Sequence, residues 1–185
     1  MGEAVKRTGW PEGNTVVIRQ EEAKDYPAVY AVIKSAFASA AHADGNEQDL
    51  VSALRQSDAF LPEMSLVAEI DGKIVGHILF TKVDIGGSVQ LALAPLSVLP
   101  EYQRRGVGSA LIREGHRRAR ELGYGYSIVL GSETYYPRMG YVPAKNFGIV
   151  PPFAVADENF MACKLREDAP AISGVVQYAK EFGIP

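Results

Sequence analysis

Apolar residues follow helical spacing in the first quarter of the chain. Over residues 28–37 they recur at intervals of three and four, which predicts an amphipathic helix, and Asp25 stands where its N-terminal cap is expected. The β-branched run 14–19 before it predicts the first strand. Residues 1–13 carry no such pattern and predict a loose N-terminal arm.

A second helix is expected over residues 47–55, after the loop 40–46. Three apolar side chains share one face of this helix: Leu50, Val51 and Leu54. Three polar side chains are expected to point away from that face: Glu47, Asp49 and Arg55.

The next section has the pattern of β-strands. Residues 65–70 and 73–80 are joined by Asp71-Gly72, a two-residue turn that hairpins prefer. Gly86-Gly87 marks a second turn, which leads into residues 89–99. Three strands in hairpin order predict an antiparallel meander.

The pattern then returns to a helical period. Residues 106–122 form the clearest amphipathic helix of the chain, with one apolar stripe: Val107, Ala110, Leu111, Gly115, Ala119 and Leu122. A strand follows at 126–130, and this strand–helix–strand crossover requires its two strands to be parallel. Residues 160–165 predict a further strand. The sequence therefore predicts a single mixed α/β domain over residues 14–185.

Composition narrows the class of protein. The 185 residues are 47% hydrophobic and 22% charged, which excludes general disorder, and a net charge of -3 gives no overall attraction to nucleic acid or anionic lipid. A single cysteine, Cys163, cannot form an internal disulfide. Neither a membrane-spanning apolar run nor a secretory signal is present, so a cytoplasmic protein is expected.

The segment with recognisable chemistry lies between the meander and the main helix. The residues from Gln103 to Ser109 include Arg104, Arg105 and two glycines, Gly106 and Gly108. The first turn of a helix exposes unpaired N–H groups at its electropositive end, and glycines let a ligand approach them. The pattern predicts a phosphate or pyrophosphate site.

Two nucleotide-binding motifs fit this loop poorly. A P-loop requires lysine before Ser109, where the chain has Gly108. A dinucleotide fingerprint requires a small residue at position 111, where the chain has leucine, and an antiparallel meander is the wrong preceding element.

The loop does resemble a known family. Gln103-Arg-Arg-Gly-Val-Gly108 is similar to the Gln/Arg-x-x-Gly-x-Gly/Ala signature of the GNAT superfamily of acyl-CoA-dependent N-acyltransferases. The preceding Leu96–Pro100 resembles the family's pyrophosphate-loop strand, and Tyr135–Tyr141 resembles its later Phe-Tyr-x-x-x-Gly-Phe element. Segments 76–80, 130–132 and 174–178 look most like the bacterial YhbS-like branch.

The resemblance implies a fold and a set of roles. The fold would be a mostly antiparallel mixed sheet with one splayed parallel strand pair and helices on both faces. Backbone groups of Leu96, Ser97 and Val98 would bond the pantetheine arm of acetyl-CoA, and the N–H of Val98 would also polarise the thioester carbonyl. The N–H groups of seven consecutive residues would hold the pyrophosphate: Gln103, Arg104, Arg105, Gly106, Val107, Gly108 and Ser109.

Tyr136 matches the family tyrosine whose hydroxyl faces the thioester sulfur and protonates the departing thiolate. Val129 and Ser132 stand where many members have asparagine and alanine, and Pro137 follows the tyrosine, so a short helix is expected around Tyr136. Residues 89–99 contain no acid that serves as general base, which leaves Glu69, Glu133 or an ordered water as candidates.

The remaining reactive side chains favour structural roles. His77 shares a strand face with apolar residues and is expected in the interior, His42 is expected in a surface loop, and Cys163 is expected to be a small buried hydrophobe. Three scattered histidines and one cysteine give no metal-ligand spacing, so no metal is expected.

The sequence favours an acetyl-CoA-dependent N-acetyltransferase that acts by direct attack in a ternary complex. Its acceptor would be a primary amine of a small molecule or peptide, with neither nucleic acid nor membrane as partner, and a homodimer is compatible with the sequence. A non-catalytic CoA-binding sensor or partner module, and a nucleotide-binding protein, are the alternatives.

Overall fold

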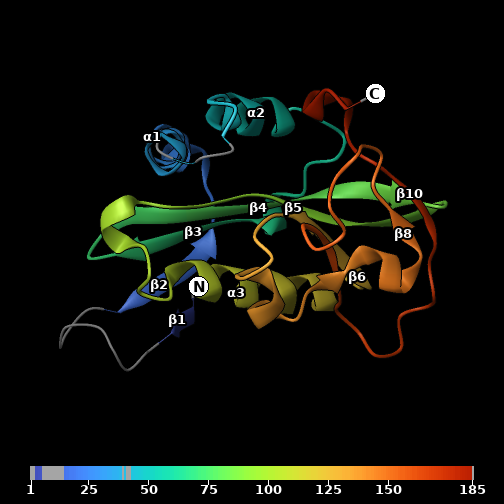
Figure 1. Ribbon diagram of the computed structural model, residues 1–185. Coiled ribbons are helices and arrows are strands. Elements are labelled where there is room, and N and C mark those ends of the chain that lie inside the picture. Colours follow the sequence, from blue (N-terminus) through green and yellow to red (C-terminus); the bar gives the residue numbers. More distant parts are fainter. Residues whose placement is uncertain (1–2, 6–14, 39, 41–42, 185) are drawn as a thin grey trace.

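The computed structural model describes residues 3–5, 15–38, 40 and 43–184, with the backbone alone for 3–5. Helices α1 (Tyr26–Phe37) and α2 (Glu47–Leu54) lie on one face of a mixed sheet, and α3 (Val107–Glu121) lies on the other (Figure 1). This arrangement confirms the predicted mixed α/β fold with helices on both faces.

Ten strands form the described sheet, with β1 to β6, β9 and β7 in spatial order and with β10 bonded to β4 and β8. Their bounds are β1 Glu3–Val5, β2 Val16–Gln20, β3 Ser65–Ile70, β4 Lys73–Ile85, β5 Ser88–Val98, β6 Tyr126–Leu130, β7 Val142–Pro143, β8 Ile149–Val150, β9 Phe160–Lys164 and β10 Gly174–Gln177.

The meander and the crossover are both confirmed. Strands β3, β4 and β5 are antiparallel neighbours, and β5 pairs in parallel with β6. That parallel register runs only from Leu91 opposite Ser127 to Leu93 opposite Val129. Because β5 continues to Val98 and β6 ends at Leu130, the two strands part after Leu93.

Helix α3 packs closely on β4. A β-carbon at Gly115 would overlap the ring of Phe80, so only glycine allows this approach. Most of the predicted apolar stripe of α3 is buried in the same core, whereas Leu122 is 47% exposed, because the helix ends at Glu121 and the chain turns away there.

Two polar side chains near α1 and α2 have partners that the sequence pattern did not indicate. Asp25 is the N-cap residue of α1, as predicted, but its side chain does not cap the helix; its carboxylate accepts the N–H of Glu22 at 2.8 Å and pairs with Arg19 at 2.7 Å. Arg55, expected to point to solvent, is buried and pairs with the equally buried Glu21. The Arg55 side chain is long enough to extend inward to Glu21, and the pairing is favourable because a buried carboxylate is costly without an opposite charge beside it.

The ends of the described chain add strands that the sequence pattern did not define. Glu3–Val5, within the segment expected to be a loose arm, pairs with β2. Gly174–Gln177 pairs with both β4 and β8, which fixes the C-terminal segment across the sheet. Within the described ranges, no helix is long and apolar enough to cross a membrane.

Two histidines are buried in the core. His77 lies on β4 with its Nε2 3.0 Å from Ser65 Oγ, and burial together with the positive charge of Arg55 lowers its pKa to about 3. His116 on α3 has its Nε2 3.0 Å from the Tyr141 hydroxyl, and burial lowers its pKa to about 4. His77 thus has the interior position predicted for it.

Buried neutral histidines make the fold sensitive to acid. Because the pKa of His116 falls from 6.5 to about 4 on folding, the unfolded chain takes up the proton first as the pH drops below 6.5. We expect the free energy of unfolding to fall by about 2 kcal/mol between pH 7 and pH 5 from this residue alone. Urea denaturation of the protein and of His116→Gln at both pH values measures it; equal losses in the two proteins would contradict this assignment.

Candidate active site

An open cleft of about 520 Å³ lies at the N-terminus of α3. Gly106 precedes the helix with a left-handed φ of 84°, and the first helical hydrogen bond runs from the Ala110 N–H to the Gly106 carbonyl at 3.0 Å. The N–H groups of residues 107–109 therefore have no helical acceptor and point out of the helix end. The cleft is lined by Leu96, Val98, Tyr102, Gln103, Arg104, Gly106, Val107, Gly108, Ser109, Tyr135 and Arg138.

The wall of this cleft depends on the absence of a side chain at Gly108. A β-carbon there would lie 2.7 Å from the Tyr135 hydroxyl, which is also 3.5 Å from Ser109 Oγ. Sequence reasoning placed Tyr135 and Arg138 in the family-like element 135–141 but gave neither a role beside α3. They follow β6, and only the fold brings them over the first turn of α3.

Two arginines were predicted beside this helix end, and they differ in position. Arg104, with a left-handed φ of 60°, lines the cleft. Arg105 is not among its lining residues; its guanidinium lies 5.8 Å from the centre of the Tyr102 ring. Both side chains are exposed to solvent.

The end of β5 presents backbone groups to the split between the strands. The Leu99 N–H donates to the Val75 carbonyl, and Val98 stands opposite Gly76. In an antiparallel ladder this makes Val98 a non-hydrogen-bonded pair member whose own N–H and carbonyl point away from β4. Gln103 Nε2 donates to the Val98 carbonyl at 3.0 Å, so the Val98 N–H remains for a ligand.

Along the end of β5, the backbone groups of successive residues point alternately toward β4 and toward the split. Leu96 stands opposite Ile78 and has the same orientation as Val98, toward the split. Ser97 stands opposite His77, with its backbone groups facing β4. The β5 backbone groups that are free to meet a ligand in the split are therefore those of Leu96 and Val98, whereas those of Ser97, predicted to do the same, hold the strand in the sheet.

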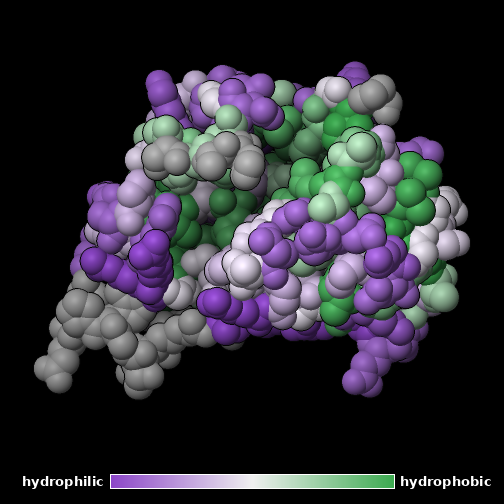
Figure 2. Space-filling view, in the orientation of Figure 1, coloured by the Kyte–Doolittle hydropathy of each residue, from purple (hydrophilic) through white to green (hydrophobic). Residues whose placement is uncertain are grey.

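A second cavity, of about 350 Å³, lies on the other side of Leu96. It is hollowed between the helices α1 and α2 and the C-terminal segment, and hydrophobic residues gather inside it and along its rim (Figure 2). Its described lining is Phe37, Asp44, Glu47, Leu50, Leu93, Ala94, Pro95, Leu96, Leu130, Tyr136, Phe153, Tyr178, Phe182 and Ile184. Leu96 lines both hollows, so the two meet at the end of β5.

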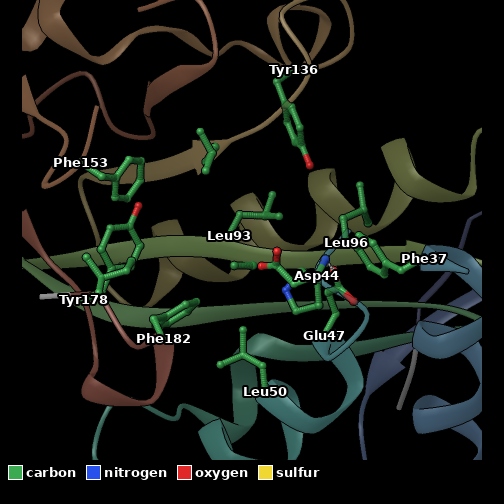
Figure 3. A pocket seen from close by; sticks show the side chains of 14 residues that line it. Phe37, Asp44, Glu47, Leu50, Leu93, Leu96, Tyr136, Phe153, Tyr178 and Phe182 are labelled. Atoms are coloured by element: carbon green, nitrogen blue, oxygen red, sulfur yellow. Dashed lines mark hydrogen bonds between the residues drawn. The ribbon is translucent and has the colours of Figure 1, made fainter. Parts of the chain in front are cut away.

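Tyr136 points its hydroxyl into this second cavity (Figure 3). Its ring packs edge-on against Tyr135 and Tyr141, with centroids 5.2 and 5.6 Å apart, and a β-carbon at Gly131 would overlap it. The helix that carries it is a single 3-10 turn, Tyr136–Met139, as Pro137 predicted. Burial raises the pKa of Tyr136 well above its usual range, so its hydroxyl stays protonated.

The acids suggested by the sequence lie elsewhere. Glu69 pairs with Arg19 at 3.0 Å on β3, and Glu133 accepts a hydrogen bond from Asn159 at 2.9 Å; neither lines the cavity. Asp44 and Glu47 do line it. Sequence reasoning assigned Glu47 to the polar face of its helix and missed it, because the rest of the wall comes mainly from β5 and from residues 130–184, which helical periodicity does not report.

Cys163 is not among the described lining residues of either hollow. Cys163 is a free thiol whose pKa burial raises to about 11, which agrees with a small buried hydrophobe. His42 lies outside the described residues. Among the described side chains, no cluster of three histidine, cysteine or acidic groups is placed to hold a metal ion.

Comparison with known proteins agrees with this geometry. The sequence model of the Acetyltransferase (GNAT) family matches residues 20–141. The uncharacterized N-acetyltransferase YjhQ of Escherichia coli strain K12 is 42% identical over 130 residues, which cover 68% of this chain and 71% of that protein. The uncharacterized N-acetyltransferase YhbS of the same strain is 29% identical over 170 residues, 90% of this chain and 98% of that protein.

Two solved structures are similar over most of their length. A GNAT family acetyltransferase from Brucella melitensis, in complex with acetyl-CoA, has a TM-score of 0.75 and 35% identity, covering 90% of this chain and 97% of that one. Escherichia coli YhbS, in complex with CoA, has a TM-score of 0.82 and 28% identity, covering 91% and 92%. The split strands, the uncapped helix end and these matches together place the chain in the GNAT family of acetyltransferases.

Proposed function

We propose that this protein transfers the acetyl group of acetyl-CoA to a primary amine by direct attack in a ternary complex. The observation that carries the proposal is the meeting of two hollows at Leu96, one beside the first turn of α3 and the other beside the Tyr136 hydroxyl. The similar proteins from Brucella melitensis and Escherichia coli were crystallised with acetyl-CoA and CoA.

The cleft at α3 suits the pyrophosphate of the co-substrate. Its unpaired N–H groups at 107–109 and the electropositive helix end favour a diphosphate, and Arg104 and Arg138 add positive charge on the lining. From there the pantetheine arm would follow β5, where the Leu96 and Val98 backbone groups face the split. This path leads the thioester to the end of the cavity that holds Tyr136.

Two groups of the chain would then act on the thioester. The Val98 N–H would donate to the carbonyl oxygen as negative charge develops on it. The neutral amine forms a bond to the carbonyl carbon, the carbon–sulfur bond breaks, and the sulfur takes the proton of the Tyr136 hydroxyl. The new amide nitrogen loses a proton, and Tyr136 is reprotonated, which leaves an acetamide and a thiol.

Two further proposals concern the domain bounds and the location of the protein. We infer that residues 14–185 form the acetyltransferase domain, with 1–13 as an arm in which Glu3–Val5 contacts β2. A cytoplasmic location agrees with the free thiol of Cys163.

Within the proposed function, the first prediction concerns the cleft at the N-terminus of α3. In Gly108→Ala the added methyl group would meet the Tyr135 hydroxyl and cover the N–H groups of the first turn, so we expect the Kd for CoA to rise by about tenfold or more. Calorimetric titration with CoA measures this change, and thermal melts check the fold.

Its control separates the two effects of the methyl group. Adding Tyr135→Phe to Gly108→Ala removes the hydroxyl that the methyl would meet, so a weak affinity that persists points to the covered N–H groups. CoA binding at the original affinity in Gly108→Ala would contradict the placement of the pyrophosphate. Stabilisation by ATP or NAD but not by CoA would favour the nucleotide-binding alternative.

The second prediction concerns Tyr136. We expect Tyr136→Phe to lower kcat by about a hundredfold or more, with little change in acetyl-CoA affinity, because only the proton donor is lost. Thiol release measures kcat, and Tyr124→Phe, which removes a hydroxyl outside both hollows, is the matched control. Unchanged turnover in Tyr136→Phe would rule out this role. Tight CoA binding without transfer to any amine would favour a non-catalytic CoA-binding module.

A further inference from the structure

The cavity beside Tyr136 has two chemically different ends (Figure 3). Asp44 and Glu47 lie at one end, near Leu96 and on the side toward which the Tyr136 hydroxyl points. Three aromatic side chains lie at the other end: Phe153, Tyr178 and Phe182. This polarity bears on what kind of acceptor the cavity can hold.

At the carboxylate end, one oxygen of Glu47 has no hydrogen-bond donor among the described residues. Glu47 Oε1 accepts the Asp44 N–H at 2.8 Å, while Glu47 Oε2 is enclosed and has no hydrogen-bond partner in the described structure. A buried carboxylate oxygen without a partner is costly, and a rotation of the Glu47 carboxylate toward the cavity that it lines would let an ammonium group of a ligand satisfy it. The charged side chains of the described lining are Asp44 and Glu47, both acidic.

The aromatic end is preorganised by ring contacts. The Tyr178 ring stacks on Phe153 at a centroid distance of 6.4 Å and meets Phe182 edge-on at 5.2 Å. All three side chains are half-buried, so part of each apolar surface faces the cavity. A flat or extended apolar group that filled this end would remove that surface from water.

We propose that the acceptor is a small primary amine with one positive charge and an apolar, aromatic tail. The proposal rests on the proposed function, since it assigns the amine to the end nearest the thioester. The ammonium group pairs with Glu47 before it releases its proton to water, and the tail lies among the rings. A carboxylate beside the amine would meet Asp44 and Glu47, and a second ammonium group would be placed among apolar rings.

A graded set of amines tests the class on the unmodified protein with saturating acetyl-CoA. The set is 2-phenylethylamine, L-phenylalaninamide, L-phenylalanine, ethylamine, spermidine and a short lysine peptide. We expect kcat/KM to be at least about tenfold higher for 2-phenylethylamine than for ethylamine, because the ring adds buried apolar area. L-Phenylalanine is expected to be worse than its amide by a similar factor, because of its carboxylate.

Two variants test the ends separately. Glu47→Gln removes the charge and is expected to raise KM about tenfold or more for both 2-phenylethylamine and ethylamine. Phe182→Leu keeps an apolar side chain and is expected to raise KM for 2-phenylethylamine but not for ethylamine. Glu158→Gln and Val175→Leu, at exposed positions outside the cavity, are the matched controls. CoA binding by calorimetry checks that each variant folds.

The outcomes for the substrate class and for the enzyme activity can be told apart. Titration of amines into the CoA-saturated protein measures binding without turnover. Binding of 2-phenylethylamine at least tenfold tighter than ethylamine supports the ligand class even if no thiol is released, which would overturn only the proposed acetyl transfer. Transfer that prefers spermidine, L-phenylalanine or the lysine peptide would keep the proposed function and overturn this inference, as would Glu47→Gln with unchanged KM.

Discussion

The close contact between α3 and β4 is the constraint on which the cleft at the N-terminus of α3 depends. Gly115 lets the helix reach the Phe80 ring, and a β-carbon at Gly76 would lie 3.1 Å from side-chain atoms of Val107 and Leu111. Because the helix is held at this distance, its first turn lies level with the end of β5. A larger residue at either glycine would push α3 away from β4, and the N–H groups of residues 107–109 would move away from the end of β5.

The second constraint is that β6 stops where β5 continues. A sheet normally uses every central backbone group in its ladder, so exposed groups in the middle of a sheet are rare. Here the split after Leu93 leaves the outward groups of Leu96 and Val98 for a ligand, while the Ser97 groups hold β5 against β4. The Tyr136 hydroxyl points toward this split, and the cavity that it enters is closed on its other side by residues of α1 and α2.

Much of this fold followed from local patterns in the chain. The α3 helix, the Asp71-Gly72 turn, the parallel crossover and the single helical turn at Tyr136 were predicted because each is specified by residues within about 40 positions. Arg55 was misplaced because its partner Glu21 lies outside its own helix, and periodicity reports only which residues share a face of one helix. The places of Glu47 and of the three aromatic residues in the cavity (Phe153, Tyr178 and Phe182) were not predicted for the same reason.

The two hollows also differ in how they are assembled. The cleft at α3 is built mainly from the continuous segment 96–109, whereas the described wall of the second cavity joins Phe37 and residues from the segments 44–50, 93–96, 130–153 and 178–184. Distant segments come together only when the whole domain is closed, and loops and chain ends open with the lowest free energies. Partial opening of the C-terminal segment would therefore dismantle the second cavity while the cleft at α3 stays intact, so hydrogen exchange at the two hollows would follow separate opening reactions.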